Sequence, residues 1–261
     1  MEEKKFYNIK SDFMNTSNFN YYDISLQEYP NEICLVLYHD KCNLNCDWCF
    51  NSSRLFDNEL SFSQAKKAID ETKDFVTAVC LSGGEPSLSP YYMKIIKYCN
   101  DLGLKVKVNT NSVEYNPYYY GKSNRIDYLN ISFKPKYIYD SIKNNNDIIL
   151  SNIMKNTFFA FDFVEWSFVY HKWIQDIDTI LLYMNRIIKA GDPKQWFSDY
   201  RPDILTINQL NVGECLNTQF NDYKPPTRDE LIEFSKQFEH IPRQKIIIET
   251  KEFGRETIFK T

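Results

Sequence analysis

Short apolar runs and amphipathic segments alternate along most of the chain. The apolar runs are too short for buried helices and end at polar turns, which is typical of strands covered on both faces. They predict strands at residues 33–38, 76–81, 104–108, 128–133, 158–169 and 204–210. The amphipathic segments place apolar residues at helical spacing and predict helices at residues 61–74, 90–102, 138–154, 174–189 and 227–239.

The ends of several predicted helices carry capping signals. Ser61 with Gln64, and Thr227 with Glu230, have the spacing of a capping box, in which each side chain binds the backbone N–H of the other residue. Gly103 stands where a left-handed residue ends a helix.

Six strands that alternate with helices predict an α/β fold with a parallel sheet, either open or curled into part of a barrel. In such sheets the functional loops follow the carboxyl ends of the strands. We expect residues 32–212 to form this core, residues 1–31 to be an N-terminal extension, and residues 213–261 to form a C-terminal tail with a helix that packs on the core.

Composition excludes several classes of function. The 261 residues carry 31 Lys and Arg against 35 Asp and Glu, a net charge of −4 without blocks of like charge, so no nucleic-acid partner is indicated. The apolar runs fall short of the roughly 20 residues that a membrane helix needs. The N-terminus has no secretion signal, so we expect a cytoplasmic, reducing location in which the seven cysteines are thiols or metal ligands.

Three of the seven cysteines lie within eight residues, in the loop after the first predicted strand. Cys42, Cys46 and Cys49 have spacings of four and three, which can surround one metal centre and leave a fourth ligand position open. Structural zinc usually takes four ligands in two pairs, and the sequence has no second pair. We favour an iron-sulfur cluster, with a zinc-binding module and unrelated buried thiols as the alternatives.

This Cys-x₃-Cys-x₂-Cys loop at the end of a first strand resembles the signature of the radical S-adenosylmethionine (SAM) superfamily. The resemblance implies a partial (β/α)₆ TIM-like barrel, a [4Fe-4S] cluster on the three cysteines, and SAM bound to the fourth iron. Trp48 stands where the family commonly has an aromatic residue, so we expect it to pack near the adenine.

The second strand ends in a sequence that is similar to the GGEP motif of the same superfamily. Gly83 and Gly84 allow a close backbone approach, and Glu85 can accept a hydrogen bond from the amino group of SAM. The resemblance therefore implies that all three residues contribute to cofactor binding. A tight turn before a helix is the simpler explanation of the same residues.

Within the superfamily, the chain is most similar to the small activases of glycyl radical enzymes, such as those for anaerobic ribonucleotide reductase and pyruvate formate-lyase. The likeness implies that Lys134 contacts the SAM carboxylate, with a solvated lysine as the alternative. Asn109 and Ser132 stand where the relatives carry Asp, and we expect Asn109, Asn111 and Ser132 to hydrogen-bond the methionyl or ribose part, with a purely structural role as the alternative. Asn31 and Lys41 stand where those relatives carry glycine, so we expect a different backbone at both positions.

The resemblance implies an anaerobic oxidoreductase that cleaves SAM to a 5′-deoxyadenosyl radical and abstracts hydrogen from a substrate. We expect a low-potential electron donor of the flavodoxin or ferredoxin type as a partner. The favoured substrate is a glycyl radical enzyme, and another protein or peptide, a nucleobase or a small metabolite is the alternative.

Overall fold

The structure is a computed structural model. It describes residues 22–49, 60–114, 124–135, 138–139, 148–149, 151–153, 155, 162–171, 182, 184–186, 202–210, 222–239 and 245–260. Residues 1–21 of the expected N-terminal extension lie outside these ranges.

The strands in the described ranges form one sheet in the order of the sequence. They are β1 (Tyr22–Ser25), β2 (Cys34–His39), β3 (Ala78–Gly83), β4 (Lys105–Thr110), β5 (Tyr128–Ser132), β6 (Phe163–Tyr170), β7 (Ile204–Gln209), β8 (Lys245–Thr250) and β9 (Gly254–Lys260). Strands β2 to β8 are parallel to one another, and β1 and β9 pair antiparallel at the two edges. The parallel sheet and its six predicted strands are confirmed.

Three strands were not predicted from the sequence. Strand β1 has only four residues, all half-buried at an edge, and therefore has no strong apolar pattern. Strand β8 contains the buried run Ile246–Ile248, whose β-branched side chains are typical of an inner strand. These additions make the parallel part of the sheet longer than the six strands that the pattern indicated.

The described helices are α1 (Phe62–Thr72), α2 (Tyr92–Asp101) and α6 (Arg228–Ser235), with 3₁₀ turns η3 (Pro86–Leu88) and η6 (Lys236–Phe238). Both predicted capping boxes are present, at Ser61 and at Thr227. The predicted helices at 138–154 and 174–189 are helical wherever single residues of them are described, and the remainder lies outside the described ranges. None of the described helices is long and apolar enough to cross a membrane.

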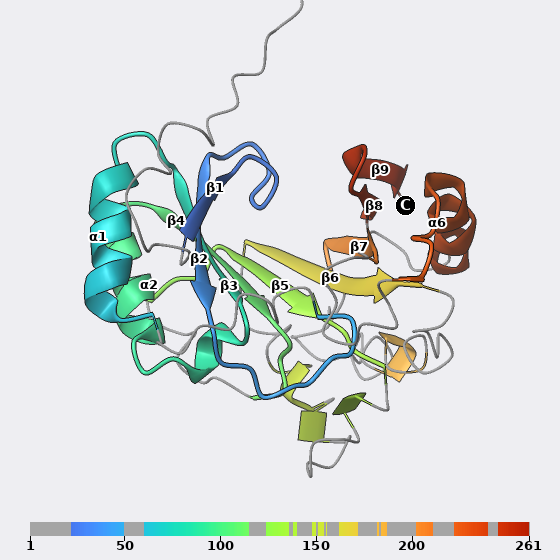
Figure 1. Ribbon diagram of the computed structural model, residues 1–261, viewed down its shortest axis with the longest axis horizontal. Coiled ribbons are helices and arrows are strands. Elements are labelled where there is room, and N and C mark those ends of the chain that lie inside the picture. Colours follow the sequence, from blue (N-terminus) through green and yellow to red (C-terminus); the bar gives the residue numbers. More distant parts are fainter. Residues whose placement is uncertain are drawn as a thin grey trace, which may run out of the picture.

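The sheet curves into an open trough with the helices on its outer face (Figure 1). Helices α1 and α2 cover the β2–β4 end, and α6 contacts β7 and β8 at the other end. Between the sheet and the helices lies the main apolar core, which includes Leu35 and Leu81. The opposite, concave face is called the lumen below. Its amino half holds a smaller apolar cluster around Tyr29, Cys80 and Tyr128.

Charged side chains are buried in the lumen beside this cluster. Lys107 of β4 is 1% exposed, and its Nζ donates to the backbone oxygen of Glu28 at 2.5 Å and lies 3.2 Å from the Glu28 carboxylate. Glu165 of β6 accepts hydrogen bonds from Tyr128 at 2.6 Å and from Arg255 at 2.7 Å. Burial would raise the pKa of Glu165, but Lys107 and Arg255 hold that pKa below its usual value. The pairs keep these groups charged inside the sheet.

Lys107→Met is expected to lower the free energy of unfolding by about 3–5 kcal/mol, because it leaves the Glu28 and Glu165 carboxylates without their shared cation. Lys105→Met is the matched control on the same strand, since Lys105 is half exposed and pairs with Glu32 at the surface. Its cost should stay below about 1 kcal/mol. Chemical denaturation followed by circular dichroism measures both, and equal costs would contradict the assigned role of Lys107.

Candidate active site

The loop after β2 carries the three cysteines across the carboxyl end of the lumen (Figure 1). Cys46 and Trp48 are buried and pack against Ile138, which follows β5, and Leu210, which follows β7. The backbone N–H of Cys49 donates to the oxygen of Cys46 at 2.9 Å, which closes a tight turn between two of the cysteines. The loop is therefore anchored by apolar contacts to the ends of two distant strands.

The glycine pair at the end of β3 holds the start of this loop. Gly83 has a φ of +98°, and a Cβ on it would lie less than 3.0 Å from two backbone atoms of His39. A Cβ on Gly84 would lie less than 3.0 Å from the carbonyl carbon and oxygen of Lys41. The N–H of Gly84 donates to His39 at 2.6 Å, and that of Glu85 donates to Lys41 at 2.7 Å. The pair thus lets two backbones touch just before Cys42.

Glu85 is buried and ties this loop to the end of β4. Its Oε1 accepts from Ser87 Oγ at 2.6 Å and from Thr110 Oγ1 at 2.8 Å, and its Oε2 accepts from the N–H of Asn111 at 2.7 Å. Burial raises the pKa of Glu85, and these hydrogen bonds oppose that rise. The carboxylate thus has a structural role within the chain, and its expected contact with SAM stays a prediction.

Asn111 stands next to the first cysteine. Its Nδ2 donates to Asn43 at 2.8 Å and lies 3.8 Å from Cys42 Sγ, and its Oδ1 accepts from the N–H of Val113 at 3.0 Å. Ser112 follows with a φ of +58°. The structure thus places Asn111 beside the cysteine loop, and its expected contact with SAM stays a prediction.

Asn109 lies deeper in the lumen than Asn111. Its Nδ2 donates to Glu28 Oε2 and to Ser82 Oγ, each at 3.2 Å, and its Oδ1 accepts from Asn130 at the same distance. Asn130 Oδ1 is buried and receives no hydrogen bond from the described residues. Asn109 therefore belongs to a network on the lumen wall and lies two residues along β4 from the contact with Cys42.

Lys134 and Ser132 lie at the end of β5. The Lys134 ammonium donates to Ser132 Oγ at 2.6 Å. Burial raises the pKa of the Cys46 thiol to about 11, and the positive charge of Lys134 opposes part of that rise. The same charge acts in the same sense on Cys42. Lys134 is thus close enough to stabilise negative charge at the cysteine loop.

The three cysteines share a loop but are not a preassembled ligand set. In the described part of the chain, no three cysteine, histidine or carboxylate side chains converge on one metal position. Metal binding has to displace the thiol protons and draw the sulfurs together. The donor type, the spacing and the apolar wall of Trp48, Ile138 and Leu210 fit a centre held by three sulfurs.

The backbone of Asn31 corrects one expectation. We expected a different backbone here because the activases carry glycine, but Asn31 keeps a glycine-like φ of +65°. Asparagine tolerates the left-handed region better than most residues, so the turn is retained at modest cost.

Sequence reasoning missed the lumen groups Glu28, Lys107, Glu165 and Arg255. A signal existed at Lys107, Asn109 and Asn111, because three polar residues at period two in a strand between apolar neighbours indicate one polar face. Glu28 and Arg255 come from segments for which no strand pairing was predicted, so their approach could not be deduced.

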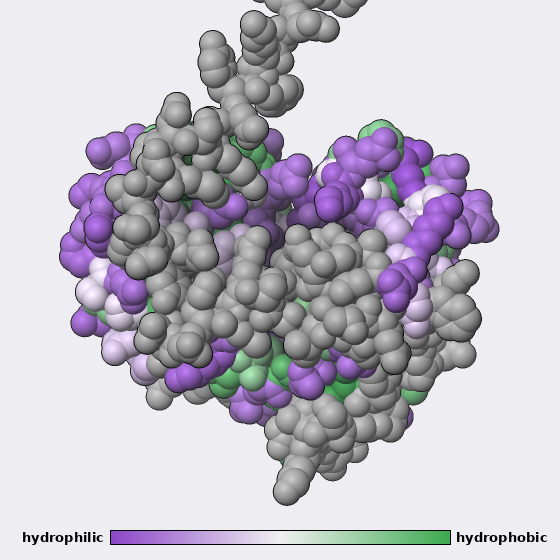
Figure 2. All heavy atoms as spheres, in the orientation of Figure 1, coloured by the Kyte–Doolittle hydropathy of each residue, from purple (hydrophilic) through white to green (hydrophobic). Residues whose placement is uncertain are grey.

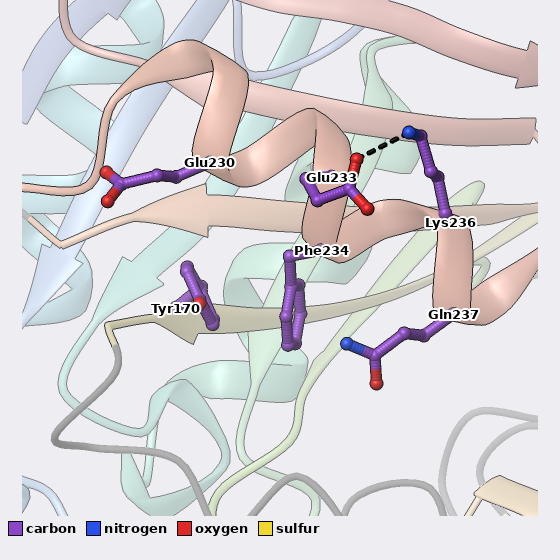
Figure 3. A pocket seen from close by; sticks show the side chains of 6 residues that line it. All are labelled: Tyr170, Glu230, Glu233, Phe234, Lys236 and Gln237. Carbon is purple, nitrogen blue, oxygen red and sulfur yellow. Dashed lines mark hydrogen bonds and ion pairs between the residues drawn. The ribbon is translucent and has the colours of Figure 1, made fainter.

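A hollow of about 470 Å³ lies between β6 and α6 (Figure 3). The ring centroids of Tyr170 and Phe234 lie 3.9 Å apart in its wall, and Glu233 pairs with Lys236 at its rim. Glu230 serves the cap of α6. The charged residues Glu230, Glu233 and Lys236 that line the hollow thus stabilise the α6 region. None of the predicted site residues lines the hollow.

Known proteins are similar to part of this chain. Residues 36–134 match the family described as the radical SAM superfamily. A Methanocaldococcus jannaschii protein, named as a proposed glycyl-radical enzyme activating enzyme, is 29% identical over 90 residues, which are 34% of this chain and 38% of that protein. An S-adenosylmethionine-dependent nucleotide dehydratase of Selenomonas ruminantium is 39% identical over 82 residues, 30% of this chain and 29% of that protein. The matches thus span less than half of each relative.

Solved structures share the fold. Streptococcus suis SuiB bound to the precursor peptide SuiA has a TM-score of 0.57 at 16% identity, over 82% of this chain and 48% of that chain. QueE from Escherichia coli has a TM-score of 0.52 at 13% identity, over 88% of this chain and 92% of that chain. The expected partial barrel is confirmed.

Gly83→Ala is expected to lower cluster content sharply, because the added methyl group displaces His39 and the loop that leads to Cys42. Gly103→Ala is the control, since Gly103 also has a positive φ, +74°, but has open space around its Cβ position. Both variants pay about 1–3 kcal/mol of backbone strain. Only Gly83→Ala should lose iron and sulfide after anaerobic reconstitution, and equal retention in the two variants would contradict the assigned contact.

Proposed function

Because residues 36–134 match the radical SAM superfamily, we propose that Cys42, Cys46 and Cys49 hold a [4Fe-4S] cluster and that SAM is cleaved at the carboxyl end of the lumen. The observation that carries this assignment is the anchoring of the cysteine loop by the glycine pair of β3, directly above a polar lumen. The bound cluster supplies the electron that splits SAM into methionine and the 5′-deoxyadenosyl radical.

Different residues around the cysteine loop bind different parts of SAM. Lys134 is close enough to the cysteines to pair with the SAM carboxylate, with Ser132 orienting its ammonium group. Asn111 and Asn109 offer amide groups to the ribose or methionyl part. Trp48 supports the loop from its buried side.

Gly83, Gly84 and Glu85 shape the remaining wall of the SAM site. Gly84 and Glu85 donate backbone hydrogen bonds to residues 39 and 41, at the start of the cysteine loop. Glu85 Oε2 accepts one hydrogen bond in the described structure, which leaves it capacity for the amino group of SAM.

The substrate loses one hydrogen atom to the radical carbon. The products of this step are 5′-deoxyadenosine and a substrate radical, and the one electron consumed comes from an external low-potential donor of the flavodoxin or ferredoxin type. The chain must hold the substrate C–H bond close to the radical carbon and keep water out.

A glycyl radical enzyme is the first candidate substrate. It is supported by the partial match to the Methanocaldococcus jannaschii protein, which covers 90 residues and only 38% of that protein. In this case the hydrogen comes from a glycine backbone that a partner protein inserts into the site.

A small polar molecule is the second candidate, and a feature of the lumen favours it. Polar side chains that face the lumen near its carboxyl end are partly exposed, as in Asn109, Asn130 and Asn208. A wall of hydrogen-bonding groups is typical of a site that orients a small ligand.

Separate alanine variants of Cys42, Cys46 and Cys49 are expected to abolish both the cluster and the formation of 5′-deoxyadenosine. Cys99→Ala is the control, because Cys99 is buried on α2 away from the loop. Iron, sulfide and zinc analysis, the visible spectrum and chromatography of 5′-deoxyadenosine after dithionite reduction give the readouts. A colourless reconstituted protein that contains zinc would instead support the zinc-binding module.

A further inference from the structure

The lumen is open at its carboxyl half and closed at its amino half. Lumen-facing residues of the amino half, such as Val36, Cys80 and Thr206, are at most 1% exposed. Although Ser167 and Asn111 are buried, several polar residues that face the lumen further along the strands are partly exposed: Ser82, Asn109, Asn130, Ser132, Asn208 and Glu249. A ligand in the lumen would therefore contact the charged side chains of the lumen. These side chains, which belong to Glu28, Lys107, Glu165, Glu249 and Arg255, are called the floor below.

Ion pairs connect the charged groups of that floor. Among the described residues that face it are the carboxylates Glu28, Glu165 and Glu249 and the cations Lys107 and Arg255. Lys107 pairs with Glu28 and Glu165. Arg255 pairs with Glu165, with 2.7 Å between Nη2 and Oε1. A phosphate or carboxylate group would find both of these cations already paired.

Glu28 presents one side of its carboxylate to the open space. Lys107, Asn109 and Cys80 all bind Oε2, whereas no described residue donates to Oε1, and the side chain is 33% exposed. Burial would raise the pKa of Glu28, but Lys107 and Asn109 hold that pKa below its usual value. Oε1 is thus a charged acceptor with room for a donor.

Glu249 lies opposite, near the carboxyl end of β8. Its carboxylate is 3.7 Å from Arg255 Nη1, the side chain is 36% exposed, and no donor from the described part of the chain binds it. Burial raises the pKa of Glu249, and repulsion from Glu28 and Glu165 adds to the rise although Arg255 opposes it. This carboxylate lacks sufficient positive charge.

The segment that carries Glu28 lies close to the β9 edge of the sheet. A Cβ on Gly254, where β9 begins, would lie 3.1 Å from Gln27 Nε2, so the segment that carries Glu28 reaches the β9 edge. Figure 2 shows an indentation between the β1 side and the β8–β9 side, bordered by hydrophilic residues.

We infer that the lumen selects a small substrate with a cationic nitrogen group, an ammonium or amidinium, which Glu28 and Glu249 hold between them. This inference rests on the proposed radical function, and it names the substrate class for the same site. The cation would supply both the donors that Oε1 of Glu28 lacks and the positive charge that Glu249 lacks. It would also add a donor to a layer in which Asn130 Oδ1 has none from the described residues.

Strand β4 sets the distance from this group to the chemistry. Asn109 binds Glu28, and Asn111, two residues further along the lumen wall, contacts Cys42. Two residues of a strand advance by about 7 Å. The C–H bond attacked therefore lies a few bonds from the cationic nitrogen rather than next to it.

A matched series of benzamidine, benzamide and benzoate tests the charge preference, since the three probes share one ring and carry positive, zero and negative charge. Binding is measured by ligand-observed NMR on the reconstituted full chain with SAM and without reductant. Benzamidine should bind about tenfold or more tighter than either of the others. Equal binding of benzoate, or binding of none of the three probes, would overturn the inference.

Variants locate the probe. Glu249→Gln and Glu28→Gln should each weaken benzamidine binding by about tenfold, whereas Glu239→Gln, at an exposed position after η6, should leave it unchanged. Retained thermal unfolding temperatures show that the variants are folded. Unchanged benzamidine binding in both lumen variants would refute the site.

The proposed function is tested separately, by 5′-deoxyadenosine formation in the unaltered chain with SAM and dithionite. Absence of that product with selective benzamidine binding would remove the radical chemistry and keep the cation site. Product formation without charge selectivity would remove the cation site alone.

Discussion

The backbone contact between β3 and the cysteine loop determines how the rest of the site is placed. His39 and Gly83 are paired in the register of β2 and β3, so the two loops that follow them start at the same point. Because Gly83 and Gly84 have no side chains, the two loops approach within hydrogen-bond distance of each other. The Glu85 carboxylate then binds the end of β4. The position of Cys42 relative to Asn111 is thus set by buried backbone and a buried carboxylate, which are stiffer than surface side chains. The proposed site must align the cluster, SAM and the substrate, and it benefits from that stiffness.

The strands that position the cysteine loop also line the lumen, and the side chains that face the lumen change in character along each strand. Lys107 and Asn109 of β4 face the lumen, and Asn111 follows the strand. Lys107 binds Glu28, Asn109 binds Asn130, and Asn111 contacts Cys42 in the cysteine loop. The period of two along a strand makes this possible, because alternate residues share one face. The intervening Val106 and Val108 pack in the main core on the other face. One strand therefore contributes to stability on one side and to a graded polar surface on the other.

The strands that contain clear apolar runs, and the helices with capping boxes, could be predicted from the sequence because their signals are local. The cysteine loop and the glycine pair could be predicted because their spacing resembles a known family. The edge strands and the lumen network could not. Glu28, Lys107, Glu165 and Arg255 are far apart in sequence, and their approach depends on the curvature of the sheet and on the pairing of β8 with β9. Asn31 shows the limit of substitution patterns, since its glycine-like backbone persists without glycine.

Stability alone does not explain why the lumen contains charges. Buried ion pairs usually gain little over apolar side chains of the same volume, because desolvation offsets much of the attraction. The amino half of this lumen shows that an apolar filling is available to the fold, with Val36, Ile204 and Ile247 packed together. Yet beside this cluster the lumen holds two cations and three carboxylates. Two of the carboxylates, Glu28 and Glu249, are also partly exposed. A charged layer that begins where the lumen opens is what recognition of a ligand requires, and packing does not require it.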